Sequence, residues 1–215
     1  MEVRVLSWAP TQSFRTSHKV SKPSQNPAFR GVFCVCRAGE ANADPHTHVA
    51  TGRAGKRVYL LVKRYDRTDV GGRWRRLHQE DYCQALGKPP SAKYESNHIG
   101  IRGPILREMF EITRRHMPPI DIVRLLDMVV VNVLTCNTDA HAKNYSIMIR
   151  AGGASLAPMY DVMCGEVWDN VTKNLAQKIA GKSRGDELEG RQWQKFAWEC
   201  GLNPKQVVDR VEALK

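Results

Sequence analysis

The sequence lacks long hydrophobic runs and lacks the cysteine pairs of a metal site. Its apolar runs, such as residues 128–131, fall far short of the roughly 18 apolar residues that cross a bilayer, so no membrane association is expected. Six cysteines are present, but only Cys34 and Cys36 stand close together and no C-x-x-C pair exists. A zinc site is therefore not expected, and the cysteines fit the reduced thiols of a cytoplasmic protein.

Acidic residues are scarce in the first quarter of the chain. Residues 1–56 contain three acids against eight lysines and arginines, few large apolar side chains, and no sustained period of 2 or 3.6. Such a segment buries too little apolar surface to offset its ordering entropy. We expect residues 1–56 to be disordered or poorly packed and residues 57–215 to form the folded domain.

Positive charge is in excess over the whole chain. The formal net charge is +11, from 33 lysines and arginines against 22 acids among 215 residues. This excess favours nucleotides, nucleic acid or other acidic partners without distinguishing between them. A nucleic-acid-binding module is one alternative, although the sequence shows neither a recognition helix nor interleaved aromatic side chains that would read bases.

Helical periodicity and short β-prone runs follow one another from residue 57 onward. The helix that begins after Pro118 has the broadest apolar face, so we expect it to be buried at the centre of the domain. The sequence predicts a strand at 58–62, helices at 79–86, 101–116, 119–136, 191–200 and 205–214, and a hairpin at 145–157. We therefore expect an α+β fold that is mainly helical.

The loop between that helix and the hairpin carries the sequence N-T-D-A-H-A-K-N at 137–144. Asp139 and Asn144 are five positions apart, as are the catalytic Asp and the metal-binding Asn of protein-kinase catalytic loops. The carboxylate can accept the proton of an acceptor hydroxyl while the amide oxygen binds Mg²⁺, and Asp161 after the hairpin supplies a second oxygen ligand. Taken one at a time, these residues have an alternative role as loop or helix caps.

Four motifs in order resemble the HipA-type serine/threonine toxin kinases. They are L-L-V-K-R-Y-D-R at 60–67, R-L-H-Q-E-D-Y-C-Q-A-L-G at 76–87 with K-Y-E-S at 93–96, N-T-D-A-H-A-K-N-Y-S-I at 137–147, and L-A-P-M-Y-D-V at 156–162. The likeness runs from about Val58 to the C-terminus. It implies the C-terminal lobe of a protein-kinase-like fold, with a hinge strand and a catalytic-loop hairpin.

The resemblance also implies roles for the loop residues. Asp139 would be the catalytic base, and Asn144 and Asp161 would be the Mg²⁺ ligands. His141 and Lys143 would lie beside the phosphates of the nucleotide. For the two loop cations taken alone, the alternative is a solvated surface position.

The other motifs resemble the hinge and the segment that follows it. Lys63 and Tyr65 would contact adenine through hinge backbone groups, although the family usually carries Glu where Lys63 stands. Gln79 and the segment 93–95 have two open interpretations, an active-site role or a structural one.

Two parts of the family's ATP-binding apparatus are not found in the sequence. No glycine-containing phosphate loop and no strand lysine is visible in residues 1–56, where the turn at 52–55 is the only candidate. We therefore expect the chain to be N-terminally truncated or divergent and its ATP binding to be impaired. The alternative function is a catalytically inactive remnant that still binds a protein partner.

The resemblance implies specific cofactors and partners. ATP and Mg²⁺ would be the cofactors, and the phosphoacceptor would be a serine or threonine of a translation factor or an aminoacyl-tRNA synthetase. A helix-turn-helix antitoxin would be the protein partner of this toxin, and DNA would be reached only indirectly, through that antitoxin.

Overall fold

The structure, a computed structural model, describes residues 32–38, 49–54, 57–167 and 170–215. The chain divides into two compact units, residues 1–78 and residues 79–215, and each is described by itself. This division lies downstream of the boundary at 56/57 that the sequence predicts. The segment expected to be disordered lies mainly outside the described residues, which include only two strands within it.

The described part of the first unit is made of β-strands. In its three-stranded sheet, β3 (Arg57–Arg64) lies between β1 (Val32–Ala38), to which it is parallel, and β2 (Val49–Ala54), to which it is antiparallel. A hairpin of β4 (Arg67–Val70) and β5 (Arg73–Arg76) follows. Gly71 and Gly72 both have positive φ, as a two-residue turn requires. The strand predicted at 58–62 lies within β3.

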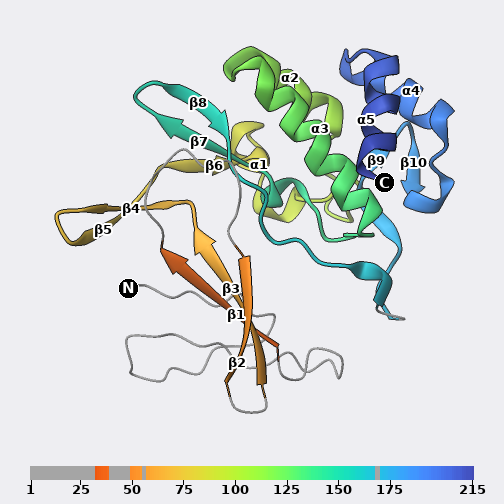
Figure 1. The fold of residues 1–215 in the computed structure, drawn as a ribbon. Helices are drawn as coiled ribbons and strands as arrows, with labels where there is room; N and C mark the ends of the chain where they lie inside the picture. Colours follow the sequence, from red (N-terminus) through yellow and green to blue (C-terminus); the bar gives the residue numbers. More distant parts are fainter. Residues whose placement is uncertain (1–31, 39–48, 55–56, 168–169) are drawn as a thin grey trace. The chain divides into compact units, whose positions relative to one another are not determined.

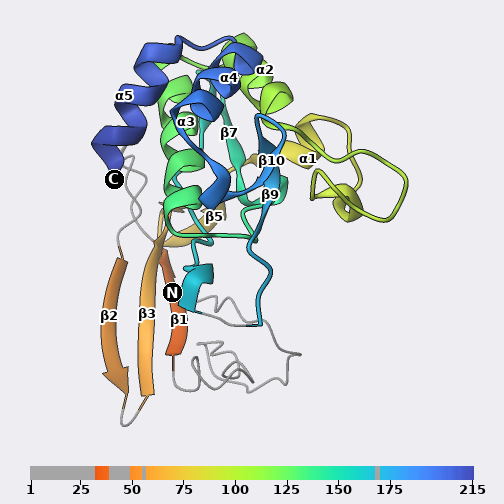
Figure 2. The ribbon, with the colours of Figure 1, turned by 90° about the vertical axis from the view of Figure 1, so that its right-hand side faces the viewer.

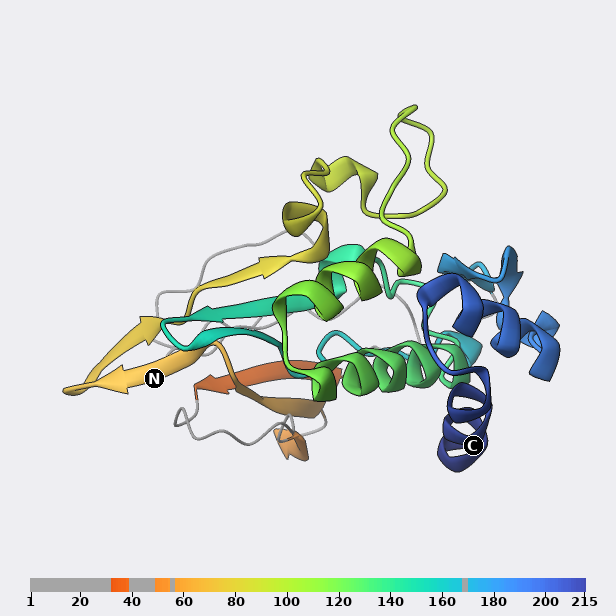
Figure 3. The same cartoon turned by 90° about the horizontal axis from the view of Figure 1, so that it is seen from above.

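The second unit contains the predicted hairpin and the buried helix. Its antiparallel sheet has the order β6 (Gln79–Asp81), β7 (Ser146–Arg150), β8 (Gly153–Leu156). Helices α2 (Leu106–His116) and α3 (Pro119–Leu134) lie side by side and both contact β8 (Figures 1 and 3). The short helix α1 (Tyr82–Ala85) begins at β6.

The C-terminal elements of this unit pack against α2 and α3. Strands β9 (Asn174–Ile179) and β10 (Lys182–Arg184) form a two-stranded sheet, followed by helices α4 (Gly190–Cys200) and α5 (Pro204–Leu214). Helix α4 packs on α2 and α5 packs on α3, as Figure 2 shows for α5. The rings of Phe110 on α2 and Phe196 on α4 meet edge to face with centroids 5.8 Å apart in the core.

The start of α3 is tied to the hairpin by a buried carboxylate. Asp121 lies in the first turn, and its Oδ2 accepts a hydrogen bond from the backbone N–H of Leu156 at 2.9 Å. Its Oδ1 accepts from Arg124 at 2.9 Å. The Asp121 side chain is 1% exposed, so both of its oxygens need these partners. This contact holds α3, which precedes the loop 137–144, against the β7–β8 hairpin, which follows the loop.

Several expected elements differ in extent. Helix α2 begins at Leu106 rather than at residue 101, because Pro104 disfavours helix in the residue before it and Glu108 caps the later start. The helix predicted from residue 79 begins as β6, which pairs with β7. The described ranges hold ten strands beside five α-helices, so the fold is more mixed than the mainly helical one that the sequence predicts.

Among the described residues, no helix combines the length and apolarity needed to cross a membrane.

Candidate active site

The loop after α3 is built on two buried asparagines. The backbone N–H of Asn137 donates to the carbonyl of Asn132 at 2.8 Å, and its Nδ2 donates to Asn132 Oδ1 at 2.9 Å. The same Nδ2 lies 3.4 Å from the backbone oxygen of Asp161. Asn132 in turn donates to the hydroxyl of Tyr145 at 2.8 Å. These contacts join the helix, the loop and the segment of Asp161 into one frame.

Asp139 lies in the same loop, and its side chain is half-buried. Its Oδ1 accepts a hydrogen bond from the hydroxyl of Tyr94, and the Nε2 of His141 lies 3.8 Å from the same oxygen. The Nδ2 of Asn144 donates to the backbone oxygen of Asp139 at 2.8 Å. The five-residue spacing therefore closes the loop on itself, and the Asn side chain is held beside the Asp.

Asp161 follows the hairpin in sequence, and its carboxyl lies near Asp139 and Asn144. It has a φ of 57°, a left-handed conformation that is uncommon for a residue other than glycine. Desolvation and then the charge of Asp139 raise the pKa of its carboxyl, whereas a hydrogen bond from the Asn144 side chain lowers it. Asp161 is exposed, so its carboxyl can be reached by a ligand from solvent. Two carboxylates and one amide thus meet at one site.

The donor set at this site suits a hard cation. Asp161 and Asn144 offer carboxylate and amide oxygens, and the mutual repulsion of the two carboxylates would be relieved by a divalent cation. Asn137 Oδ1, next to this site, is a buried oxygen without a hydrogen-bond partner. Within the described ranges no group of three or more His, Cys, Asp or Glu side chains is arranged to hold a metal ion by itself. A cation here would therefore rely on mixed protein and water oxygens, which Mg²⁺ accepts.

His141 is a buried and uncharged neighbour of the carboxylates. Burial lowers the pKa of its imidazole, the charge of Lys93 lowers it further, and Asp139 acts in the opposite direction. Its ring meets the ring of Tyr94 edge to face at 5.3 Å, and its Nδ1 has no hydrogen-bond partner. A neutral imidazole at this position can donate or accept a hydrogen bond but adds no charge.

The remaining predicted residues have different surroundings. Lys143 makes an ion pair with Asp81 at 2.8 Å, and Asp81 caps α1. Gln79 lies in β6, paired with Met148. Lys63 in β3 and Tyr65 just after it belong to the first unit, which is described by itself.

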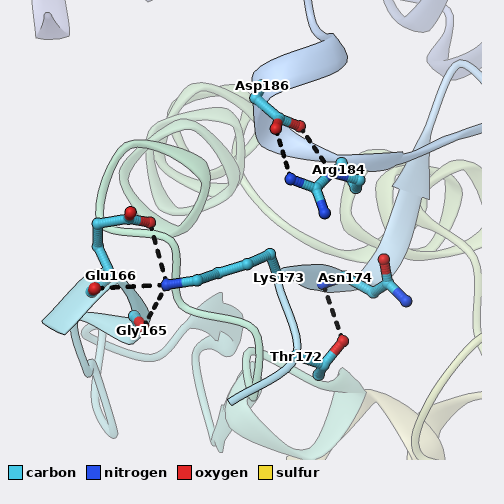
Figure 4. Close-up of polar contacts among 7 residues, drawn as sticks. All are labelled: Gly165, Glu166, Thr172, Lys173, Asn174, Arg184 and Asp186. Carbon is cyan, nitrogen blue, oxygen red and sulfur yellow. Dashed lines mark hydrogen bonds and ion pairs between the residues drawn. The ribbon is translucent and has the colours of Figure 1, made fainter. Parts of the chain in front are cut away.

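The segment that follows Asp161 is anchored by a lysine. Lys173 Nζ donates to the Gly165 carbonyl at 3.0 Å and lies 3.2 Å from Glu166 Oε2, while Arg184 and Asp186 pair nearby (Figure 4). The Gly165 N–H donates to the Cys136 carbonyl at 3.1 Å. A Cβ at Gly165 would lie 2.2 Å from that oxygen, so only glycine fits there.

Two side chains that the sequence reasoning missed or left open contact the loop. Tyr94, left open, reaches Asp139 across 45 positions of sequence. Gln177 on β9, missed altogether, has its amide between the Ala140 carbonyl, 2.8 Å away, and the Ala142 N–H, 3.1 Å away. Gln177 lies in no motif, and only the three-dimensional fold places it at the loop.

Comparisons with known proteins show to which family the chain is related. A family model described as the HipA-like C-terminal domain matches residues 13–215. The putative kinase Y4mE of Sinorhizobium fredii is 34% identical over 215 residues, covering 95% of this chain and 49% of that protein. The serine/threonine-protein kinase toxin HipA of Shewanella oneidensis is 33% identical over 167 residues, covering 73% of this chain and 39% of that protein.

A solved structure shows the same fold. In the complex of HipA, HipB and operator DNA from Shewanella oneidensis MR-1, one chain matches with a TM-score of 0.71 and 27% identity, over 79% of this chain and 42% of that chain. The present chain thus spans about half or less of the length of these relatives. The family match reaches further toward the N-terminus than the resemblance from Val58 onward. The chain belongs to the HipA-like family.

Proposed function

We propose that this chain carries the catalytic and metal-binding part of a Mg²⁺-dependent kinase that transfers the γ-phosphate of ATP to a serine or threonine of a protein. The observation that carries the proposal is the meeting of Asp139, Asn144 and Asp161 at one site. A base and two oxygen ligands are among the parts that phosphoryl transfer needs around one phosphate.

Each residue has a defined task in the transfer. Asp139 accepts the proton of the acceptor hydroxyl. The hydroxyl oxygen forms a bond to the γ-phosphorus as the bond between that phosphorus and ADP breaks. Asn144 and Asp161 would hold Mg²⁺, which supplies neutralisation of phosphate charge when bound. His141, uncharged and buried, is placed to orient phosphate oxygens by hydrogen bonding. Lys63 and Tyr65 would supply the adenine contacts.

Lys143 is given a smaller part. It is paired with Asp81 in the structure, so its charge is partly neutralised, and a contact with phosphate would require it to share or leave this partner. We propose that it adds positive potential beside the nucleotide.

A second function is favoured by one observation. The solved neighbour is a HipA chain in a complex with HipB and operator DNA. By analogy this chain would bind a helix-turn-helix antitoxin and reach DNA through it, and it could do so as an inactive module. The phosphoacceptor of an active chain would be a translation factor or an aminoacyl-tRNA synthetase in the cytoplasm.

Phosphotransfer to a reconstituted translation mixture separates the two functions. The chain is incubated with γ-labelled ATP in Mg²⁺ or in EDTA, and labelled proteins are identified by mass spectrometry. We expect Mg²⁺-dependent phosphoserine or phosphothreonine on one translation component. A folded chain that binds an antitoxin but labels nothing in Mg²⁺ would favour the inactive module.

A further inference from the structure

Tyr94 contacts both ionisable side chains of the loop. Its hydroxyl donates to Oδ1 of Asp139, and its ring lies edge to face against His141 at 5.3 Å. Burial raises the pKa of its phenol, and the hydrogen bond to Asp139 raises it further, so Tyr94 is a permanent donor at neutral pH. A donated hydrogen bond to a carboxylate is among the stronger hydrogen bonds in proteins.

The backbone around Tyr94 is fixed to the same loop. The carbonyl of Lys93 accepts from the N–H of Ala142, three residues after Asp139. On the other side, the Glu95 N–H donates to the Ala176 carbonyl at 3.1 Å, and a Glu95 carboxylate oxygen accepts from the Lys178 N–H at 2.7 Å. The segment 93–95 is therefore held between the loop and β9.

The backbone carbonyl of Tyr94 is restrained by contacts with Asn97 and Gly103. Asn97 Nδ2 donates to the Tyr94 carbonyl at 3.0 Å, and a Cβ at Gly103 would lie 1.9 Å from that oxygen. The phenol is thus presented to Asp139 from a backbone with little freedom. Such preorganisation matters in phosphoryl transfer, because most of the catalysis is positioning.

We propose that Tyr94 is a positioning residue for the reaction above, holding the Asp139 carboxylate through Oδ1 so that Oδ2 accepts the proton of the acceptor hydroxyl. This inference rests on the proposed function. Asp139 has one carboxylate oxygen engaged by Tyr94, and Asn144 fixes its backbone. Without the phenol, the carboxylate can rotate, and productive orientations become rarer.

Tyr94→Phe tests the proposal by kinetics. The variant keeps the ring that packs on His141 and removes only the hydroxyl. We expect kcat to fall about tenfold while the KM for ATP stays within about twofold, because orientation of the base is lost and nucleotide contacts are not. Tyr82→Phe is the matched control. It also removes a buried tyrosine hydroxyl, but one that is hydrogen-bonded to Thr113 of α2, with 2.6 Å between the two oxygens, and not to a loop residue. An unchanged kcat, or a raised KM with kcat intact, would overturn the role.

A second arm does not depend on transfer activity. Unfolding equilibria are measured for Tyr94→Phe, Asp139→Ala and the double variant. If the two side chains are bonded, we expect their effects on the unfolding constant to be non-additive by at least about fivefold. Additive effects would overturn the proposal even in an active chain. Strong coupling in a chain that transfers no phosphate would instead leave the contact intact and count against the proposed function.

Discussion

Replacing Asp139 by asparagine lowers the rate of phosphotransfer by about a thousandfold in this account, with Mg²⁺-ATP binding preserved. The amide cannot accept the proton of the acceptor hydroxyl, and loss of a general base typically costs two to four powers of ten in rate. The variant retains a side-chain oxygen for the Tyr94 hydroxyl, and Asp139 is only half-buried, so the fold should survive.

The measurement is the initial rate of transfer from labelled ATP at saturating Mg²⁺. Asp186→Asn provides the matched control, because Asp186 is exposed and its partner Arg184 is not a residue of the proposed site. We expect its rate to equal that of the parent chain. Equal rates for the parent chain and Asp139→Asn would remove Asp139 from the role of base.

Replacing Asp121 by alanine should destabilise the second unit by about 3 kcal/mol. The change leaves the buried N–H of Leu156 without its acceptor and removes a negative charge from the first turn of α3. Both losses act at the joint between the helix and the hairpin that present the loop. Chemical denaturation followed by circular dichroism measures the free energy of unfolding.

Asp209→Ala is the control for this stability prediction. It makes the same substitution in α5, where Asp209 forms an exposed pair with Lys205. We expect a change below about 0.5 kcal/mol there, since exposed pairs contribute little. A similar small change for Asp121→Ala would show that the helix and the hairpin are not joined through this carboxylate.

Local patterns were enough to predict the elements around the loop. The apolar face after Pro118 marked α3, and the Gly-Gly turn marked the β7–β8 hairpin. The order of these elements explains why Asp139, Asn144 and Asp161 come together, although their roles in catalysis stay predictions. The same reasoning did not find the β4–β5 hairpin, in whose strands five of eight residues are charged and polarity alternates little.

Long-range contacts were not predictable from local patterns. Gln177 is separated from the loop by the β7–β8 hairpin and the segment before β9, and nothing in its immediate sequence marks it as a loop contact. Tyr94 lay in a motif that resembles the family, but its hydrogen bond to Asp139 depends on how the segment 93–95 packs against β9. The position of the helix start at Leu106 likewise depended on a cap and a proline that outweigh the apolar spacing.

Calorimetric titration of the chain with ATP, in Mg²⁺ and in EDTA, tests the central claim most directly. Asp161→Asn is measured beside it, because this change removes the charge of one proposed ligand at a solvent-exposed position. The account predicts weak, Mg²⁺-dependent binding by the parent chain, lost in EDTA and lost in the variant. Absence of binding by the folded parent chain, or equal binding by Asp161→Asn, would contradict it.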